Sequence, residues 1–404
     1  MSNTYTHAAI VPLIGGQLIG QQQAFGSLPE YILSYSVFKN NDSQILNYYD
    51  NKVPYHLLDE KPTYKAKNVD VVMATCPCAG LSTLGMKSSS DNPMNDWMIQ
   101  SADYVLKTVK PKVFWGENAP ALAGKNGKPI VDKLRAIAER EGYTMSLYKT
   151  KSLLHGLSQV RKRSFYFFWK GKEIPLLPYV NRPYEKIEDT IRKSVVSDDD
   201  PMNILANSKT PSEDPVYRYI LEELHGGISH KQFIEQLPSH TNTLSYVEAF
   251  FAQPPEVTYQ KLKEWMSKNN YSNEEGKCER RAAKLASGGN IMRNTTGFAK
   301  DYIGAFVGHH PTCLTHPDHD RYLTIRECLD IMKMPKDFEL LGGRKNLNHI
   351  CQNVPVSTAK DMALGIRTAL DGKLETVSAK FLVQNNHNQT RDMELEVSTL
   401  EAFI

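Results

Sequence analysis

Short apolar runs alternate with amphipathic segments over the first 170 or so residues of the chain. Runs of small and β-branched residues, of which residues 71–75 are the clearest, are typical of strands buried on both faces of a parallel sheet. We expect such strands over residues 8–16, 31–38, 71–75, 112–115, 143–149 and 164–169. Helical spacing of apolar residues predicts helices over residues 17–24, 43–49 and 130–141, and one that ends at Lys110.

The strand–helix alternation stops near residue 172. Proline-rich and acidic linkers follow, and helices are then expected over residues 216–224, 230–236 and 258–268, with a basic run over 277–284. Regular helices return over residues 324–332 and 356–371. This pattern predicts an α/β fold built on a Rossmann-like, doubly wound and mostly parallel sheet, together with a second, smaller domain.

Length and composition agree with a two-domain globular protein. A chain of 404 residues is longer than one typical core. No apolar run approaches the roughly 20 residues that cross a bilayer, and the N-terminus lacks the features of a secretory signal. The cysteines are scattered, at positions 76, 78, 278, 313, 328 and 351, so we expect no disulfide scaffold. These features predict a soluble cytoplasmic protein with no membrane partner.

Positive charge is concentrated in one part of the chain. The formal net charge is only +3, but residues 104–172 hold 15 Lys and Arg against 4 Asp and Glu, a local charge of +11. A basic surface of this size suits a polyanion such as nucleic acid. A solvated basic face, which is common on α/β enzymes, is the alternative.

Two side chains that could take part in a reaction follow predicted strands. Cys78 comes directly after the strand over 71–75, where Pro77 and Gly80 end the strand, and Glu117 follows the strand over 112–115. The carboxyl ends of parallel strands meet at one edge of a sheet, where ligands bind in open α/β folds. The pair therefore predicts a nucleophile and a carboxyl group at one site, although a buried structural thiol is the alternative for Cys78.

A basic segment and a glycine turn extend this prediction. Strand alternation puts Gln159, Arg161 and Arg163 on one face of an extended segment, where they would form a platform for phosphate or base oxygens. A solvated edge strand is the alternative. Gly15 and Gly16 form a tight turn between the first strand and helix, an arrangement that lets the backbone approach a cofactor closely.

A histidine-rich segment raises the possibility of zinc. His309, His310, Cys313, His316 and His319 lie close together in the sequence. Their spacing does not match that of zinc ligands, and Pro311 and Pro317 break the segment into loop, so we expect no metal site.

Taken in order, five short motifs resemble those of the DNA (cytosine-5) methyltransferase family. They are Pro77-Cys78, Glu117-Asn118, Gln159-x-Arg161-x-Arg163, Arg321-x-x-Thr324-x-x-Glu327 and Val354-Pro355. The resemblance covers residues 8–171 and 311–370. It implies a class I methyltransferase fold and a DNA (cytosine-5-)-methyltransferase that acts, as a monomer, on double-stranded DNA in a bacterial or phage-infected cell.

The resemblance also implies the role of each residue. Cys78, with the neighbouring Pro77, would supply a thiolate that adds to carbon 6 of cytosine, because carbon 5 is a poor nucleophile until an enamine forms. Glu117 would act at ring nitrogen 3. Arg161 and Arg163 would hold the carbonyl oxygen of the base, while Asn118 and Gln159 orient their neighbours. The base would be flipped out of the duplex.

The implied cofactor is S-adenosylmethionine. The residues that would bind it by resemblance are Ile14, Gly15, Gly16, Phe38, Asp59, Met98, Asn353 and Val356. This half of the chain departs from the family pattern: Val11 and Leu13 stand where an aromatic residue and a glycine are usual, and Phe38 stands where an acidic residue holds the ribose. Asn40, Asn41 or Asp42 could replace that acid.

The domain boundaries follow from the same comparison. We expect a catalytic domain over residues 1–171, a target-recognition domain over 172–310, a return to the catalytic domain over 311–376 and a tail over 377–404. A catalytically silent DNA-binding homologue, a modified donor and an RNA substrate remain alternatives to the active DNA enzyme. Roles in restriction-modification, in protection of a phage genome and in regulation are all compatible with these residues.

Overall fold

The computed structural model describes residues 4–61, 64–77, 80–81, 89–194, 197–238, 246–251, 255–289, 291, 296–308 and 310–395. Cys78 and His309 lie outside the described residues. The strands are β1 (His7–Ile10), β2 (Ile32–Ser34), β3 (Tyr55–Leu57), β4 (Val71–Ala74), β5 (Val113–Asn118), β6 (Tyr143–Lys151), β7 (Lys162–Lys170), β8 (Glu173–Pro175), β9 (Thr376–Asn385) and β10 (Thr390–Leu395). The helices are α1 (Gly16–Phe25), α2 (Lys39–Tyr48), α3 (Asp96–Tyr104), α4 (Lys128–Glu141), α5 (Ile187–Lys193), α6 (Pro215–Tyr219), α7 (His230–Gln236), α8 (Tyr246–Phe251), α9 (Pro255–Lys268), α10 (Glu275–Ala286), α11 (Ile325–Ile331), α12 (Leu347–Gln352) and α13 (Val356–Leu370).

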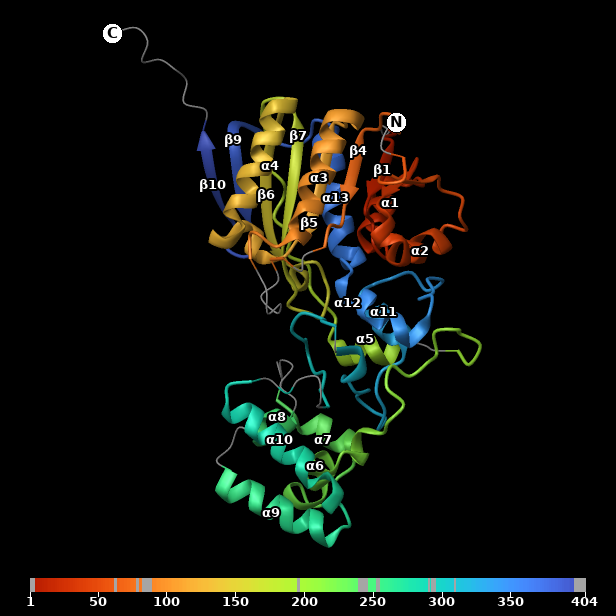
Figure 1. The fold of residues 1–404 in the computed structure, drawn as a ribbon, viewed down its shortest axis with the longest axis vertical. Coiled ribbons are helices and arrows are strands. Elements are labelled where there is room, and N and C mark those ends of the chain that lie inside the picture. The colour runs from red at the N-terminus through yellow and green to blue at the C-terminus, as the bar shows by residue number, and fades with distance from the viewer. Residues whose placement is uncertain are drawn as a thin grey trace, which may run out of the picture.

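The strands form one sheet with the order β10-β9-β6-β7-β5-β4-β1-β2-β3, and β8 pairs with β9 (Figure 1). Strands β3, β2, β1, β4 and β5 run parallel, β7 runs antiparallel between β5 and β6, and β9 is again parallel to β6. The carboxyl ends of β4, β5, β6 and β9 therefore meet at one edge of the sheet. This confirms the predicted α/β fold with a mostly parallel central sheet.

The central strands are buried on both faces, as their continuous apolar runs predict. In β4, Val71 and Met73 belong to one core cluster, and Val72 and Ala74 belong to the other. The first cluster includes residues of α1 and α13, and the second includes residues of α3 and α4. The sheet is thus covered by helices on both sides, which is why these strands show no apolar–polar alternation.

The helices α6 to α10 form a separate body with its own core (Figure 1). The residues of this cluster all fall between Val216 and Phe298, and aromatic side chains such as Tyr217 and Phe233 contribute much of it. In Figure 1, the edge of the sheet that carries the carboxyl strand ends faces this helical body. In the part of the chain that the structure describes, no helix is both long and apolar enough to span a bilayer.

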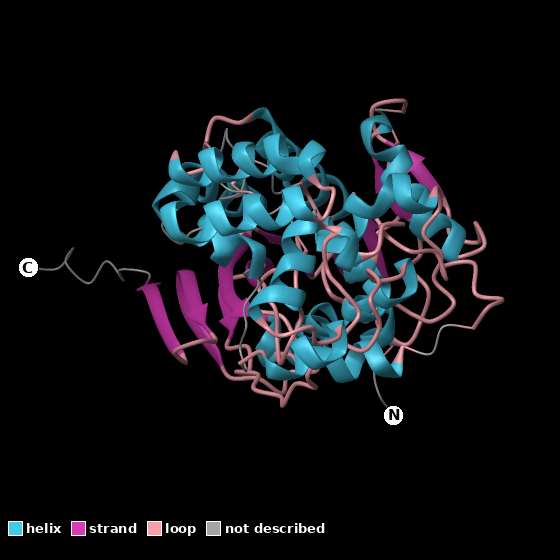
Figure 2. Ribbon diagram, turned by 90° about the horizontal axis from the view of Figure 1, so that it is seen from below, coloured by secondary structure: helices cyan, strands magenta, loops and turns pink. Residues whose placement is uncertain are grey.

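Several boundaries differ from the sequence prediction. The strand expected over 8–16 is shorter, because β1 ends at Ile10 and the glycine turn then leads into α1. The expected strand over 31–38 ends at Ser34, because Ser36 begins a short 3-10 helix whose first amide is bound by Asp59. The strand expected over 112–115 continues to Asn118. Residues 376–395 show no clear hydrophobic pattern in the sequence. They form β9 and β10, which extend the sheet beyond β6 (Figure 2).

Candidate active site

Glu117 lies at the tip of β5, beside the end of β4. The two strands are parallel, and Ala74 at the end of β4 is in register with Gly116. Thr75, Cys76 and Pro77 continue from β4 at this edge, and Pro77 is the last residue described before Cys78. Glu117 is only 3% exposed, so its carboxyl group is held at the sheet edge and largely shielded from water.

Arg163 forms an ion pair with Glu117 across the β5–β7 ladder. Glu117 lies opposite Phe165 in the antiparallel register, so Arg163, two residues away on the same face, can reach its carboxylate. The contact joins Arg163 Nε and Glu117 Oε1 and lies almost entirely inside the protein. A second guanidinium nitrogen of Arg163 donates to the carbonyl of Lys162 at 2.7 Å. The predicted meeting of a carboxyl group and a guanidinium group is therefore observed.

Asn118 and Met98 lie behind this pair. The Asn118 side-chain oxygen accepts a hydrogen bond from the Ala119 amide at 2.8 Å, which fixes the chain as it leaves β5. Its amide nitrogen donates to the sulfur of Met98 at 3.8 Å, and both side chains are buried. Asn118 thus holds the backbone at the end of β5, and its role in the active site stays a prediction, whereas the surroundings of Met98 are those of a core residue.

Gln159 and Arg161 point to a different partner from Arg163. Arg161 Nη1 donates to the carbonyl oxygen of Phe306 at 2.9 Å, and Gln159 Oε1 accepts from the Phe306 amide at 3.3 Å. The backbone of Gln159 also forms an isolated parallel β-bridge with Ile303. The segment that follows the helical body is therefore anchored to the sheet by these two buried side chains, and the structure favours a positioning role for both.

Cys76 follows β4 at the strand tips, but its thiol is buried. It hydrogen-bonds to the Ser101 hydroxyl at 3.9 Å. Desolvation raises the pKa of Cys76 to about 12, so its thiolate is scarcely populated at neutral pH. Cys76 is therefore not a candidate for the nucleophile.

The glycine turn after β1 is tightly packed by protein. Gly15 has φ of +98°, and a Cβ at this position would lie 2.4 Å from Ile45 Cδ1. A Cβ at Gly16 would lie 2.2 Å from the Val354 carbonyl oxygen. Protein packing thus explains both glycines, and their contact with a cofactor stays a prediction.

The same turn contains two strained residues. Val11 has φ of +50° and Leu13 has φ of +52°. This left-handed conformation costs an L-residue about 1–2 kcal/mol. Leu13 is the position where the resembling family has glycine, so the backbone keeps the conformation that glycine would adopt freely. Strained backbone of this kind is characteristic of functional loops.

The first residues of helix α13, and the segment just before it, pack against the glycine turn and α1. Asn353 Oδ1 accepts a hydrogen bond from the Gly16 amide at 2.9 Å. A Cβ at Gly20 would lie 2.6 Å from the Cβ of Ala359 and 2.8 Å from the Val356 carbonyl, so α1 and α13 pack with their backbones close together. Ile14, Gly15, Gly16, Asn353 and Val356 are therefore brought together although they come from opposite ends of the chain.

Aromatic side chains gather beyond the end of β2. The ring of Trp97 lies 5.3 Å from that of Phe38 and 4.6 Å from that of Tyr35. Asp59 accepts hydrogen bonds from the Ser36 amide at 2.9 and 3.0 Å. Partial burial favours a higher pKa for Asp59, but the bonds from Ser36 outweigh it and lower the pKa. Tyr35 and Trp97 were not identified from the sequence, although Trp97 is conspicuous in a polar segment.

Asp42 is a buried acid next to the glycine turn. It is fully buried, and its Oδ2 accepts a hydrogen bond from the Tyr55 hydroxyl at 2.9 Å. Burial raises the pKa of Asp42 to about 7, although hydrogen bonds from Ser34, Tyr55 and the Leu13 backbone act in the opposite direction. Asp42 therefore helps to hold the glycine turn in place through its hydrogen bond with the Leu13 backbone.

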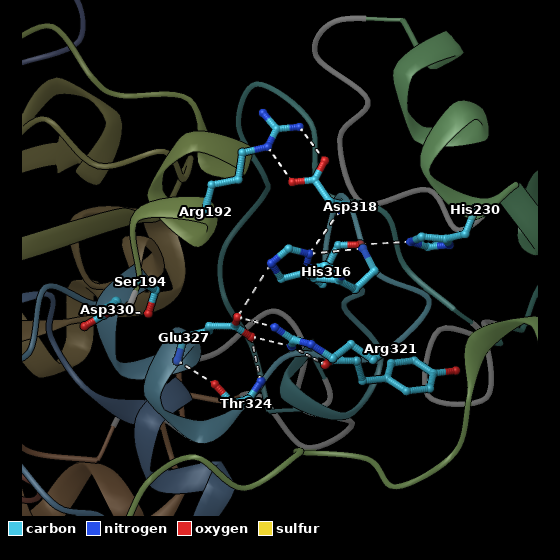
Figure 3. A network of polar contacts seen from close by, with 11 residues as sticks. Arg192, Ser194, His230, His316, Asp318, Arg321, Thr324, Glu327 and Asp330 are labelled. Atoms are coloured by element: carbon cyan, nitrogen blue, oxygen red, sulfur yellow. Dashed lines mark hydrogen bonds and ion pairs between the residues drawn. The ribbon is translucent and has the colours of Figure 1, made fainter. Parts of the chain in front are cut away.

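A polar network joins the helical body to the sheet domain (Figure 3). Arg321 binds Glu327 through both guanidinium nitrogens at 2.7 and 2.9 Å, and Thr324 forms a reciprocal cap with Glu327. The His316 carbonyl accepts a hydrogen bond from His230 of α7 at 2.8 Å, and Asp318 pairs with Arg192 of α5. The Arg321–Glu327 motif thus has a structural role at this junction.

The histidines of this segment take part in hydrogen bonds. His316 Nδ1 accepts from the amides of Asp318 and His319 at 3.0 and 3.2 Å, and burial lowers the pKa of His316 to about 4. It is therefore a neutral hydrogen-bonding residue at pH 7. Among the residues that the structure describes, no group of His, Cys, Asp and Glu side chains is arranged to hold a metal ion.

Comparison with known proteins identifies the family. The model of the C-5 cytosine-specific DNA methylase family matches residues 14–367. The type II methyltransferase M.AgeI of Thalassovita gelatinovora is 32% identical over 99 residues, a match that spans only 24% of this chain and 23% of that protein.

Two solved structures share the fold. A protein described as a DNA modification methyltransferase encoded within an E. coli prophage superposes with a TM-score of 0.56 at 15% identity, over 91% of this chain and 99% of its own. The Entamoeba histolytica methyltransferase EhMeth superposes with a TM-score of 0.52 at 9% identity, over the same shares. Since the family model covers most of the sequence, the chain belongs to the C-5 cytosine-specific DNA methylase family.

Proposed function

We propose that this chain is an active DNA cytosine-5 methyltransferase, which transfers a methyl group to carbon 5 of a flipped-out cytosine in double-stranded DNA. The buried ion pair between Glu117 and Arg163 is the observation that carries this proposal. This pair supports the proposal because it lies at the end of β5, beside the end of β4, and Cys78 follows β4 in the sequence. Among the cysteines, Cys78 is the proposed nucleophile, because the thiol of Cys76 is buried and has a raised pKa.

The chemistry proposed for these residues is covalent catalysis. The Cys78 thiolate adds to carbon 6 of cytosine while Glu117, in its protonated form, donates its proton to ring nitrogen 3, so that carbon 5 becomes nucleophilic. Arg163 stabilises the charge that develops on the carbonyl oxygen of the base. After carbon 5 is methylated, water takes up the proton from carbon 5, the thiolate leaves carbon 6 and the proton on nitrogen 3 returns to Glu117, so that the ring is restored. Arg161 and Gln159 keep the following segment in place.

The residues around the glycine turn fit an adenosine-containing cofactor. Trp97, which is partly exposed and packs on the buried rings of Tyr35 and Phe38, offers ring surface to an adenine, and the exposed carboxylate of Asp59 lies near this cluster. Ile14, Gly15 and Gly16 would line the methionine end, with Asn353 and Val356 of the α13 end behind them. S-adenosylmethionine, when bound, supplies the electrophilic methyl group.

The helical body is the proposed target-recognition domain. It has its own core, and the edge of the sheet that carries Glu117 faces it (Figure 1). Contacts such as His230 to His316 fix its position. A body placed in this way can read base edges in the major groove while the sheet edge handles the flipped base. The similarity to a type II methyltransferase and to a prophage-encoded protein supports a role in DNA modification.

Nucleoside mass spectrometry tests this proposal directly. DNA from cells that express the chain should contain 5-methylcytosine, and bisulfite sequencing should place it in one sequence context. Cells that express Cys78→Ser should contain none. If 5-methylcytosine appears in RNA alone, the substrate is RNA. If neither nucleic acid is methylated while the purified chain still binds DNA, the chain is a silent homologue.

A further inference from the structure

Three lysines and one histidine gather at the edge of the sheet where β6 and β9 end and β7 begins. Lys151 of β6 lies opposite Lys162 of β7, and Lys149 lies opposite Asn385 of β9. Residues directly opposed in a ladder share one face, so the three lysine side chains lie on the same face. His387 follows β9 in the turn to β10, and burial together with the charges of the three lysines lowers its pKa to about 4, so it is neutral at pH 7. We call Lys149, Lys151 and Lys162 the basic ridge.

The turn that carries His387 is held rigidly. Asn386 is buried; its amide donates to Thr150 Oγ1 and to the Val180 carbonyl at 3.0 Å, and its oxygen accepts from the Val180 amide at 2.9 Å. The backbone amide nitrogen of Asn386 donates a hydrogen bond to the carbonyl oxygen of Lys149 at 2.8 Å. Asn388 and Gln389 remain exposed at the tip. The ridge is therefore a preformed surface, which lowers the entropy cost of binding.

The positive charge of the ridge is not compensated locally. Several lysines elsewhere have acidic partners, such as Lys39 with Glu60 and Lys128 with Asp132. Within the part of the chain that the structure describes, none of Lys149, Lys151 and Lys162 forms an ion pair. A solvated face would be expected to mix both signs of charge. An excess of one sign on a rigid edge is typical of a surface that meets a polyanion.

The ridge lies at the same edge of the sheet as the candidate active site. Strands β5, β7, β6 and β9 are consecutive in the sheet, and Lys162 directly precedes Arg163 in β7, so its side chain is directed to the other face of the sheet from the Arg163–Glu117 pair. Three strand spacings place the β9 end roughly 14 Å from that of β5. This separation corresponds to about four base pairs of duplex. β9 and β10 also lie beyond residues 14–367, which match the family model.

We propose that the basic ridge binds the phosphate backbone of duplex DNA that flanks the target cytosine. This inference rests on the proposed function, because it takes DNA to be the substrate. The lysines supply point charges for phosphate oxygens, and the exposed amides at the turn supply hydrogen bonds. Such contacts position the duplex and carry no sequence information.

The test compares two triple variants of the full chain. The ridge variant carries Lys149→Gln, Lys151→Gln and Lys162→Gln. The control variant carries Lys107→Gln, Lys170→Gln and Lys172→Gln, three exposed lysines away from the edge of the sheet that carries Glu117 and the basic ridge. Binding to a duplex of random sequence is measured over a range of salt concentrations. We expect the ridge variant to bind at least about tenfold more weakly and its salt slope to fall by about 2–3, since each lost phosphate contact removes about 0.9.

The outcomes separate the ridge from the proposed function. Thermal unfolding first establishes that both variants fold. A ridge variant with the affinity and salt slope of the parent chain overturns the ridge proposal and leaves the proposed methyltransferase activity unaffected. A ridge variant that loses DNA affinity supports the ridge even if nucleoside analysis finds no 5-methylcytosine, in which case only the proposed activity fails.

Discussion

Arg161 Nη1 lies 2.9 Å from the carbonyl oxygen of Phe306, whereas Arg163, two residues later, pairs with Glu117. The two arginines are thus directed to different parts of the molecule. Arg161 joins the sheet to the segment that leaves the helical body, and Arg163 belongs to the candidate active site. This separation predicts different consequences when each is replaced by lysine.

Arg163→Lys should abolish most of the activity with little loss of stability. A lysine keeps a positive charge near Glu117 but lacks the planar array of donors of a guanidinium. Loss of one such donor at a developing oxyanion typically costs about a hundredfold in rate. Methyl transfer, measured per folded molecule, should fall by about that factor.

Arg161→Lys should instead lower stability. The Phe306 carbonyl would lose a buried donor, at a cost of about 1–3 kcal/mol. Denaturant unfolding should report this loss, while methyl transfer per folded molecule should stay within about tenfold of the parent chain. The reverse pattern for the two variants would show that Arg161, and not Arg163, acts on the base.

Gly15→Ala should destabilise the chain more than Gly142→Ala, although both glycines have positive φ. Gly142 also has positive φ, but a Cβ there would meet no atom within 4 Å, so Gly142→Ala should cost only the about 1–2 kcal/mol of the left-handed conformation. At Gly15 the new methyl group would also overlap Ile45, at a further cost of about 1–3 kcal/mol.

A double variant shows whether this overlap is the cause. Ile45→Ala removes the atoms that meet the new methyl group, so Gly15→Ala should cost less in the Ile45→Ala background than in the parent chain. Equal costs in the two backgrounds, measured by denaturant unfolding, would rule out packing against Ile45 as the reason for glycine.

Asp42 should make the chain less stable as the pH rises. Its pKa is raised by burial from 3.8 in the unfolded chain to about 7 in the folded protein, so the folded state binds the proton more tightly. The resulting stabilisation is complete below pH 3.8 and is lost as the pH rises through about 7, with an upper limit of about 4 kcal/mol.

Comparison with Asp42→Asn isolates this effect. The neutral side chain has no proton to lose, so the free energy of unfolding of the parent chain should decline relative to that of the variant between pH 4 and pH 7. Asp59→Asn serves as a control of opposite sign, because the pKa of Asp59 is lowered and its contribution is lost as the pH falls. A constant difference between parent and Asp42→Asn would mean that Asp42 is already ionised at low pH.

Local patterns predict the fold well and its polar strand ends poorly. The buried strands and their helices were expected because continuous apolar runs have few other solutions in a parallel sheet. The end of β5 was predicted too early because its last residues, Glu117 and Asn118, are polar and interrupt the apolar run that indicates a buried strand. β9 and β10 were missed because only isolated residues such as Ala379 and Leu382 face the core.

The site depends on contacts that no local pattern encodes. Gly16 and Asn353 meet across 337 positions of sequence, and only the packing of α1 on α13 explains why. Alternation predicts a common face for Gln159, Arg161 and Arg163, but β7 begins at Lys162, so the first two precede the strand and turn elsewhere. The family resemblance located Glu117 and Arg163, which the structure brings together.

Covalent trapping on DNA that contains 5-fluorocytosine tests the central claim most directly. Fluorine at carbon 5 blocks the final elimination, so the adduct between Cys78 and carbon 6 should accumulate when S-adenosylmethionine is present. We expect a denaturation-resistant complex whose cross-linked peptide contains Cys78, and we expect none with Cys78→Ser, which should still bind DNA. A complex attached through another residue, or DNA that is methylated by Cys78→Ser, would contradict the account.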